Sequence, residues 1–270
     1  NEVAYVEKIK EFTSMDDRIH LIHHKENKGL FKARLTGVEY SSANYITFVD
    51  ADDSITIDWI RLLVKNALKY NSDIVMGKTV NMDSCGRLYV YNANYSFCNR
   101  PPIYKNEIFE MLMQDRGLDF SIHTVWNKLY SKKLWERAWN DLCEIDKHLV
   151  MTEDILFSFV LFYYAEIMSF SNHDGYIYYR NENSSTLSSY SYTKIKKYIE
   201  DISIVFSSVE RFLSKKNVLN NHSLYWQEWK DRYFRWWSYN VKNVCVQLDL
   251  QEAQEISSLF LRIFDKDEIE

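Results

Sequence analysis

The sequence contains little glycine and proline, 6 and 2 residues among 270. Long linkers are therefore not expected, because these two residues dominate turns and flexible connections. No apolar run reaches about eighteen residues, so no membrane-spanning helix is predicted. The N-terminus has neither the basic region nor the apolar core of a signal peptide. Because the sequence begins with Asn1 rather than Met, we interpret it as a mature or truncated piece.

The chain also lacks an excess of positive charge and closely spaced cysteine pairs. The net charge of −5 argues against nucleic acid as the main partner. None of the cysteines forms a CxxC pair or another metal-ligand spacing. They are interpreted as free, mostly buried thiols in a reducing compartment. The four are Cys85, Cys98, Cys143 and Cys245.

The residues that are abundant describe a globular protein with many aromatic side chains. Hydrophobic residues make up 46% and charged residues 26%, which is ordinary for such a chain. The aromatic content of 16% is high and includes 20 Tyr and 8 Trp. Aromatic side chains bury large areas, and they also suit carbohydrate-binding and interfacial surfaces.

The most informative stretch is YITFVDADD, residues 45–53. Its β-branched and aromatic start predicts a strand buried on both faces, and its acids lie at the strand's carboxyl end, where open α/β sheets bind ligands. On a continuing strand Asp50 and Asp52 would point to the same side. Such paired oxygen ligands suit Mg²⁺ or Mn²⁺ bound to a phosphorylated ligand. The alternative is an acidic turn that leads into a helix.

Residues 48–53 resemble the DxD segment of the family 2 glycosyltransferases with the GT-A fold. Four further segments resemble that family's motifs in the same order, although Leu35 stands where the family usually has Asn. They are Asn27-Lys28-Gly29 with Ala33-Arg34 and Gly37, then Trp126 to Tyr130, then Thr152-Glu153-Asp154, and finally Tyr178-Tyr179-Arg180 with Ser184-Ser185.

This resemblance implies an inverting transfer of a sugar from a nucleotide diphosphate to an acceptor hydroxyl. It implies that Asp154 is the base, that Asp52 binds the metal, and that Asp50 faces the metal or the donor ribose. Glu153 would face the acceptor or a structural partner. Trp126 would stack on a sugar ring or belong to the core. The donor side would comprise Asn27, Gly29, Arg34 and Asp50.

Simpler interpretations remain open for several of these residues. Asp154 is also what a helix N-terminus favours, because acids there interact well with the helix dipole. Arg34 could be a solvated helical arginine. His173 could be a further metal ligand, but a lone histidine is more often structural.

The pattern of elements predicts an α/β fold, a GT-A-like doubly wound mixed sheet with a helical C-terminal appendage. Residues 19–23 and 45–49 are expected to form strands, and residues 166–179 a pair of strands. We expect Thr152 to cap a helix. The GT-A-like domain would span 1–191, N-terminally truncated because the two strands that open the family's chains are absent, and the helical region 192–270.

Residues 222–248 form an expected helix with a stripe of aromatic side chains. The stripe would cover the core of the catalytic domain, mediate a homodimer, or lie on a membrane surface. The first of these is the most ordinary role for such a stripe. The Arg235-Trp236 pair is interpreted as a chance match to a motif of processive relatives, which favours single transfers.

The expected protein is a bacterial glycosyltransferase that builds surface polysaccharide. Its expected location is the cytoplasm, with the inner face of the membrane as one option. Its donor would be a nucleotide sugar, by family habit UDP-linked, its cofactor Mn²⁺ or Mg²⁺, and its acceptor a saccharide or a lipid-linked molecule. The alternative is a catalytically inactive binding or assembly module with the same fold. A sugar nucleotidyltransferase would need a Gly-rich basic loop that this sequence lacks.

Overall fold

The structure is a computed structural model that describes residues 2–89, 99–179 and 191–269. Its helices are α1 Glu2–Met15, α2 Gly29–Tyr40, α3 Trp59–Tyr70, α4 Asn106–Asp115, α5 Phe120–His123, α6 Lys132–Cys143, α7 Glu153–Tyr164, α8 Tyr192–Lys215, α9 Leu219–Cys245 and α10 Leu250–Phe264. Its strands are β1 Tyr45–Thr47, β2 Ser54–Ile55, β3 Ile74–Met82, β4 Leu88–Tyr89, β5 Ile103–Tyr104, β6 Lys128–Ser131 and β7 Ile167–Tyr179.

The described strands form one mixed sheet in the order β1-β6-β3-β7-β2, with β4 paired to β3 and β5 to β7. The long strands β3 and β7 are parallel, whereas β6 runs antiparallel to both β1 and β3. The predicted mixed α/β fold with C-terminal helices is confirmed. The expected strand pair at 166–179 is wrong, because β7 is a single strand that continues along β3 to Tyr179.

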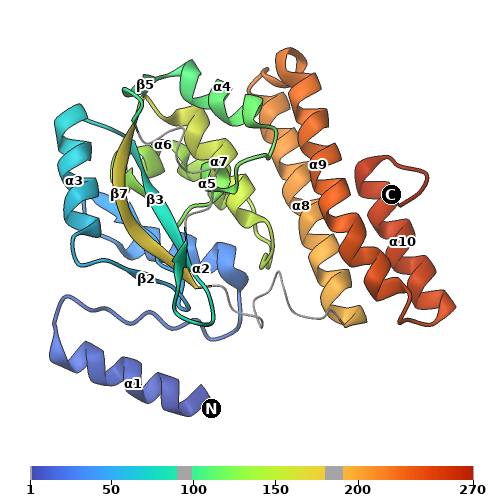
Figure 1. The fold of residues 1–270 in the computed structure, drawn as a ribbon, viewed down its shortest axis with the longest axis horizontal. Helices are drawn as coiled ribbons and strands as arrows, with labels where there is room; N and C mark the ends of the chain where they lie inside the picture. The colour runs from blue at the N-terminus through green and yellow to red at the C-terminus, as the bar shows by residue number, and fades with distance from the viewer. Residues whose placement is uncertain (1, 90–98, 180–190, 270) are drawn as a thin grey trace.

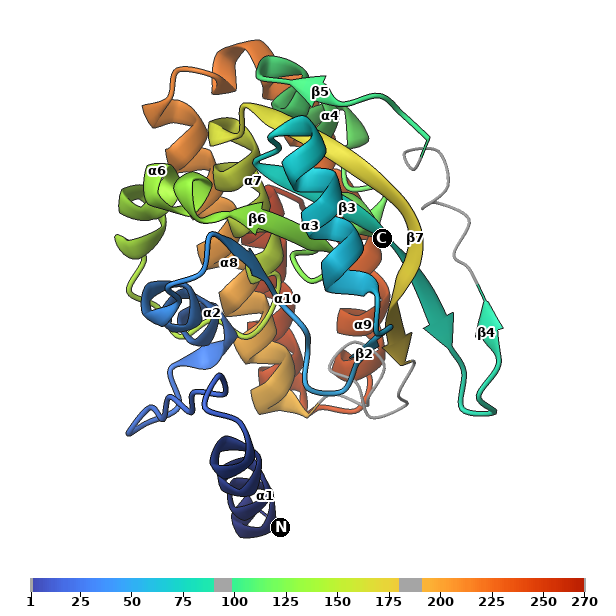
Figure 2. The ribbon, with the colours of Figure 1, turned by 90° about the vertical axis from the view of Figure 1, so that its left-hand side faces the viewer.

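Helices cover the sheet on both faces (Figures 1 and 2). Along β3, Ile74 and Met76 face the large core that includes α2, α4, α6 and α7, whereas Val75 faces the smaller core beneath α3. This alternation follows from the two-residue repeat of a strand. The buried, nearly all-apolar α7 lies at the centre of the large core, which places its N-terminus beside the sheet edge that carries the site.

The strand predicted at residues 45–49 forms only as Tyr45–Thr47, and it lies at the end of the strand order rather than at the centre. It pairs with β6 alone among the described strands. The strand expected at Ile19–His23 does not form, and Leu21 and Ile22 are exposed. A strand needs a hydrogen-bonding neighbour, and no described strand pairs with this segment.

The indole of Trp59 fills the space between α3 and the two parallel strands. A Cβ on Gly77 of β3 would lie 1.9 Å from the Trp59 ring, and a Cβ on Gly175 of β7 would lie 2.2 Å from it. The two glycines therefore let a fully buried tryptophan approach both strands. This contact fixes α3 against the sheet.

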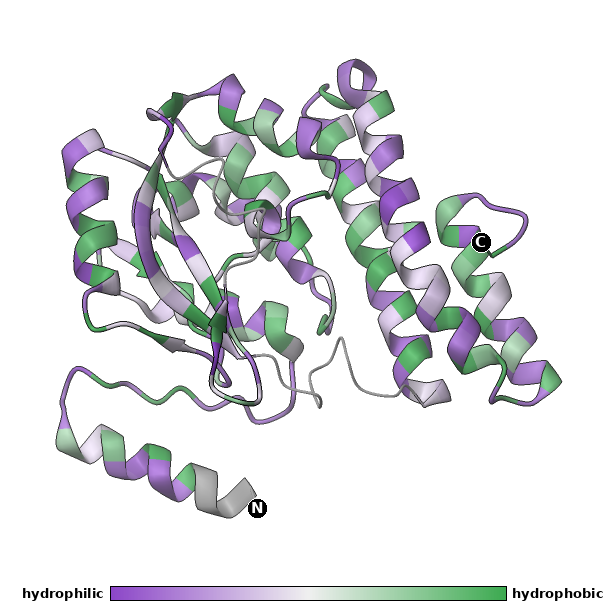
Figure 3. Cartoon of the chain, viewed as in Figure 1, coloured by the Kyte–Doolittle hydropathy of each residue, from purple (hydrophilic) through white to green (hydrophobic). Residues whose placement is uncertain are grey.

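Helix α8 packs on α7 and α9 packs on α4, whereas α10 packs on α8 and α9. Buried apolar residues of all three helices belong to the large core, and Figure 3 shows how hydrophobic and hydrophilic residues are distributed along them. The aromatic stripe of α9 lies partly in this core, where Trp226 and Trp229 contact Phe159 of α7. The core-covering role expected for this helix is thus what the structure has. No helix among the described residues is long and apolar enough to cross a membrane.

The structure also bears on the expectations for the cysteines, for Thr152 and for the motif at Tyr178. The cysteines described are free, but Cys85 and Cys143 are exposed rather than buried. Thr152 precedes α7, yet its side chain makes no cap; its backbone is left-handed and its hydroxyl donates to the Met151 carbonyl. Of the motif that begins at Tyr178, the residues Arg180, Ser184 and Ser185 lie outside the described residues.

Candidate active site

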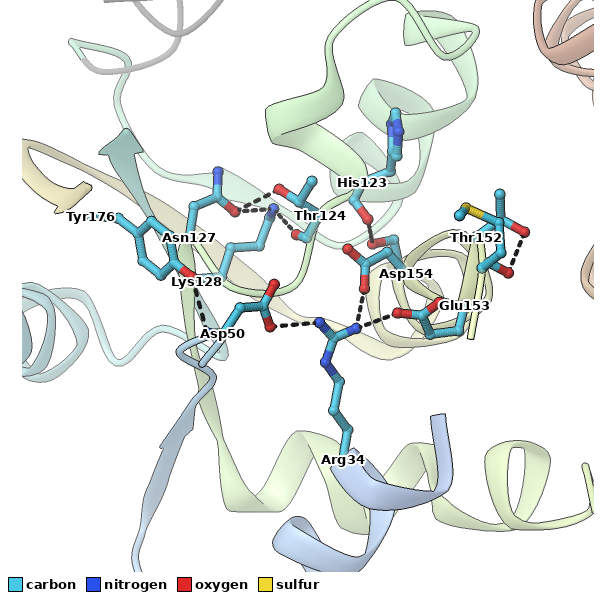
Figure 4. Close-up of polar contacts among 12 residues, drawn as sticks. Arg34, Asp50, His123, Thr124, Asn127, Lys128, Thr152, Glu153, Asp154 and Tyr176 are labelled. Carbon is cyan, nitrogen blue, oxygen red and sulfur yellow. Dashed lines mark hydrogen bonds and ion pairs between the residues drawn. The ribbon is translucent and has the colours of Figure 1, made fainter. Parts of the chain in front are cut away.

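Arg34 of α2 connects three carboxylates that are far apart in the sequence (Figure 4). One guanidinium nitrogen donates to Glu153 Oε1 at 2.7 Å and also to Asp154 Oδ1. The other terminal nitrogen donates to Asp50 Oδ1 at 3.0 Å. The loop after β1 and the first turn of α7 are thus held together by one side chain. The interpretation of Arg34 as a solvated arginine is wrong, because this side chain is only 6% exposed.

The cluster carries more negative than positive charge in a largely buried place. Burial raises the pKa of Glu153, and the neighbouring charge of Asp154 adds to this. Burial also raises the pKa of Asp154, while the Arg34 guanidinium opposes the rise. A carboxylate whose pKa is moved toward neutrality is suited to accept a proton during a reaction. Arg34 can keep such a base ionised while it waits for substrate.

The start of α2 is tied to the segment that leads into α7. Gly29 forms a parallel bridge with Leu149, and Phe31 N–H donates to the Leu149 carbonyl at 3.2 Å. Gly29 has a φ of +79°, and a Cβ there would lie 2.5 Å from the Leu149 oxygen. The exposed Asn27 accepts from the Gly29 N–H at 3.0 Å. The structure therefore gives Gly29 a packing role, and Asn27 shapes its turn.

The acidic loop at 50–53 is a turn rather than a continuing strand, since Asp53 N–H donates to the Asp50 carbonyl. The sequence suggested that Asp50 and Asp52 point to the same side of a continuing strand. Because residues 50–53 form a turn, this alignment does not apply. Asp52 is exposed, and it makes no hydrogen bond or ion pair with the residues that the structure describes. Asp50 faces Arg34 instead.

Within the described ranges, no group of three or more His, Cys, Asp or Glu side chains is arranged to hold a metal. His173 forms a hydrogen bond with Thr56 at 3.1 Å and packs beside Trp59. The exposed Asp52 carboxylate is one oxygen ligand that an ion could use, and such an ion would take its remaining ligands from donor phosphate and water. Mg²⁺ is commonly bound in that way, through one or two carboxylates.

Sequence reasoning missed Tyr176 and Asp53. The Tyr176 hydroxyl donates to Asp53 Oδ2 at 2.7 Å and accepts from the Asp50 N–H at 3.1 Å. Burial raises the pKa of Asp53 to about 6, although hydrogen bonds from the Tyr176 hydroxyl and the Tyr179 N–H to this carboxylate act in the opposite direction. Tyr176 therefore fixes the backbone of the acidic loop. Tyr176 lies two residues before Tyr178, the first residue of the family motif. This spacing places Tyr176 and Tyr178 on the same side of the strand.

Lys128, named only as part of a motif, also belongs to this region. Its ammonium is fully buried and donates to the Ser121 carbonyl at 2.6 Å and to Asn127 Oδ1 at 2.7 Å. Burial lowers its pKa to about 7, against the attraction of Asp154 and Asp119. Figure 4 shows the Lys128 ammonium bonded to Thr124 and Asn127, whereas Arg34 is the cation joined to Asp154.

Two residues expected on the acceptor side are otherwise engaged. Glu153 is buried against Arg34, which fits the structural-partner alternative. Trp126 stacks on Tyr176 with ring centroids 4.5 Å apart and on Tyr178 at 5.8 Å. It packs against the smaller core, which fits its core alternative.

The fold and the arrangement of acidic residues define a GT-A-like glycosyltransferase domain. The family model "Glycosyl transferase family 2" matches residues 3–139, about half of the chain, and the chain belongs to this family.

Curated relatives are bacterial. The chain is 38% identical over 136 residues to the glycosyltransferase GlyA of Streptococcus pneumoniae, a match that covers 49% of this chain and 19% of GlyA. It is 34% identical over 177 residues to the uncharacterized glycosyltransferase EpsJ of Bacillus subtilis, covering 66% of this chain and 49% of EpsJ. The chain thus spans at most about half the length of these two relatives.

A solved structure shares the fold. It is that of residues 1–349 of TarS from S. aureus in complex with UDP, which superimposes with a TM-score of 0.54 at 16% sequence identity. The match covers 89% of this chain and 62% of the TarS chain. At this identity the likeness concerns the fold.

Proposed function

We propose that the protein transfers a sugar from a nucleotide-diphosphate donor to an acceptor hydroxyl, with inversion and with the help of a divalent metal. The observation that carries this proposal is the Arg34 cluster. It joins Asp50 of the DxD segment to Asp154, the residue at the family's base position. Because both residues pair with Arg34, the acidic loop that would face the donor lies close to the base that would activate the acceptor.

In this proposal Asp154 accepts the proton of the acceptor hydroxyl as the oxygen attacks the anomeric carbon. Arg34 pairs with its carboxylate, and the buried ammonium of Lys128 attracts this carboxylate without a direct hydrogen bond. A single displacement of this kind inverts the configuration and needs no glycosyl-enzyme intermediate. Asn27 and Gly29 support the donor side through the turn that starts α2.

Asp52, with Asp50 as a second candidate, would hold Mn²⁺ or Mg²⁺. When bound, the ion neutralises charge on the leaving diphosphate. The exposed Asp52 carboxylate is available for this role, whereas the Asp50 carboxylate is already in an ion pair with Arg34. A UDP-linked donor is supported by the relative TarS, whose crystal structure contains UDP.

The proposal includes a role in surface polysaccharide synthesis, on a saccharide or lipid-linked acceptor at the cytoplasmic side of a bacterial membrane. The bacterial sources of the relatives support this setting. A homodimer or membrane contact through residues 222–248 would use the side of α9 that does not face the core.

Calorimetric titration of UDP with and without Mn²⁺ tests the proposal. The unaltered chain should bind UDP in a Mn²⁺-dependent manner, and Asp52→Ala should weaken this binding at least tenfold, because it removes the unpaired carboxylate. Asp17→Ala removes an exposed acid in the turn after α1 and should leave binding unchanged.

Absence of UDP binding with Mn²⁺ present would contradict the proposal and favour the inactive-module alternative. Equal binding by the unaltered chain and by Asp52→Ala would contradict the metal role of Asp52.

A further inference from the structure

The side of α9 carries a hollow that is separate from the Arg34 cluster in its lining residues. This hollow of about 310 Å³ opens between the segment 117–120, which leads into α5, and the middle of α9. This volume is at the small end of ligand pockets. Its walls include Leu118, Phe120, Arg232, Tyr233, Arg235 and Trp236.

Two exposed aromatic rings form one wall of this α5–α9 pocket. Phe120 and Trp236 meet edge to face with centroids 4.9 Å apart. They remain 45% and 38% exposed, which is unusual for rings of this size that already contact each other. A sugar ring presents an apolar C–H face that can pack against such rings while its hydroxyls stay in water.

Two arginines bring positive charge to the pocket. Arg232 and Arg235 are three residues apart on α9 and therefore share one side of the helix. Both are exposed, and neither makes an ion pair or hydrogen bond with the described part of the chain.

The acids nearest to them on α9 are already paired. Glu228 pairs with Arg116 at 3.5 Å, and Asp231 pairs with Lys266 at 3.0 Å. Asp231 also attracts Arg235 electrostatically. Both guanidinium groups are nevertheless exposed and without a hydrogen-bonding partner among the described residues. Guanidinium groups bind phosphate oxygens with two parallel hydrogen bonds, so the pair fits a phosphate group.

Hydrogen bonds connect one wall of the pocket to α7, the helix that begins with the proposed base. This wall is Tyr233, whose hydroxyl bonds His123 Nε2 at 3.1 Å. The His123 carbonyl accepts from Ser158 of α7 at 2.8 Å, one turn beyond Asp154. The carboxylates of Asp154 and Glu153 also add to the effect of burial in raising the pKa of Tyr233. A ligand in the pocket would therefore contact a side chain that is connected to α7 through His123.

We propose that the α5–α9 pocket binds a sugar-phosphate unit of the acceptor, with the phosphate on Arg232 and Arg235 and the sugar ring against Phe120 and Trp236. The assignment to the acceptor rests on the proposed function, because it needs the donor at the acidic loop. The binding of a sugar phosphate in the pocket can be measured independently.

Glucose 1-phosphate is the probe, followed by saturation-transfer NMR and calorimetry in the presence of saturating UDP and Mn²⁺, which occupy the donor site. The chain should bind glucose 1-phosphate at least fivefold more tightly than glucose or inorganic phosphate. The double variant Arg232→Gln/Arg235→Gln should lose at least tenfold in affinity. Arg262→Gln, an exposed arginine of α10, is the matched control and should bind as the unaltered chain does.

UDP binding, measured in the same samples, separates the two proposals. If UDP fails to bind but the arginine-dependent binding of glucose 1-phosphate persists, sugar-phosphate binding in the α5–α9 pocket is supported and the proposed sugar transfer is contradicted. If the double variant binds glucose 1-phosphate like the unaltered chain, the pocket proposal is overturned. It is also overturned if phosphatidylglycerol vesicles bind through these arginines while glucose 1-phosphate does not, because the surface would then be a membrane contact.

Discussion

At the scale of single residues, Arg34 has the greatest influence on the site. It is the cation that Asp50, Glu153 and Asp154 share, and it lies almost entirely out of contact with water. Removing one member of a buried charge cluster leaves the others uncompensated, which costs more than the cluster itself contributes. The geometry of the base and the donor loop therefore depends on this one side chain.

We predict that Arg34→Met destabilises the protein by about 3 kcal/mol, the usual cost of leaving buried charge unpaired. The loss should be larger at pH 8 than at pH 5. Without the cation the pKa values of the carboxyls rise further above their unfolded values, so the folded state loses stability as pH rises through them. Urea unfolding at the two pH values measures this.

The control for this prediction is Arg61→Met. Arg61 is 67% exposed and pairs with Asp58 on the surface of α3, so the change should cost less than about 1 kcal/mol. Equal losses in the two variants would contradict the role given to Arg34.

The sequence predicted part of the site. Arg34, Asp50 and Asp154 were all expected there, and they do meet, although 120 residues separate Arg34 from Asp154. The direction of each side chain was not predictable. Whether Asp50 faces a metal or an arginine depends on the turn that ends β1, and the stacking of Trp126 depends on β7, far away in the chain. Motif spacing carries no information about such long-range contacts.

At the scale of elements, the long helices were the easiest to predict and the short strands the hardest. The helix expected at residues 222–248 forms as α9, Leu219–Cys245, because its apolar spacing repeats over several turns. The position of β1 in the sheet could not be predicted, because strand order is decided by pairing between distant segments.

The contact of α3 with the sheet gives a sharp test. Gly77→Ala should destabilise the protein by about 2 kcal/mol, because the added methyl group overlaps the buried ring of Trp59. Gly37→Ala is the matched control: this glycine lies in α2 with nothing within 4 Å of the added Cβ. It should be neutral or stabilising by up to about 1 kcal/mol, because alanine favours helix.

Midpoints of urea denaturation compare the two variants. Similar midpoints for both would show that the indole moves aside without cost, which would contradict the proposed fixing of α3 by this contact.

At the scale of the whole molecule, a single apolar core runs from α2 to α10. The division expected near residue 191 stays a prediction, but Phe159 of α7 packs between Trp226 and Trp229 of α9, across that boundary. Segments that share a core usually unfold together.

We therefore predict one calorimetric unfolding transition for the chain, with calorimetric and van't Hoff enthalpies in a ratio near one. Trp226→Ala, which opens a cavity in this shared core, should lower the midpoint of the whole transition. Two separate transitions, only one of them moved by Trp226→Ala, would instead establish the helical region as an independent domain.

The double attachment of α2 has a consequence for partial unfolding. The helix is bound to the segment before α7 at Gly29 and Phe31, and to α7 itself through Arg34. Elements joined in this way open as one cooperative unit. Fraying of α2 would therefore disperse the donor loop and the base together while β3 and β7 stay paired. The protein can lose its site without losing its fold, so intact secondary structure does not by itself guarantee an assembled active site.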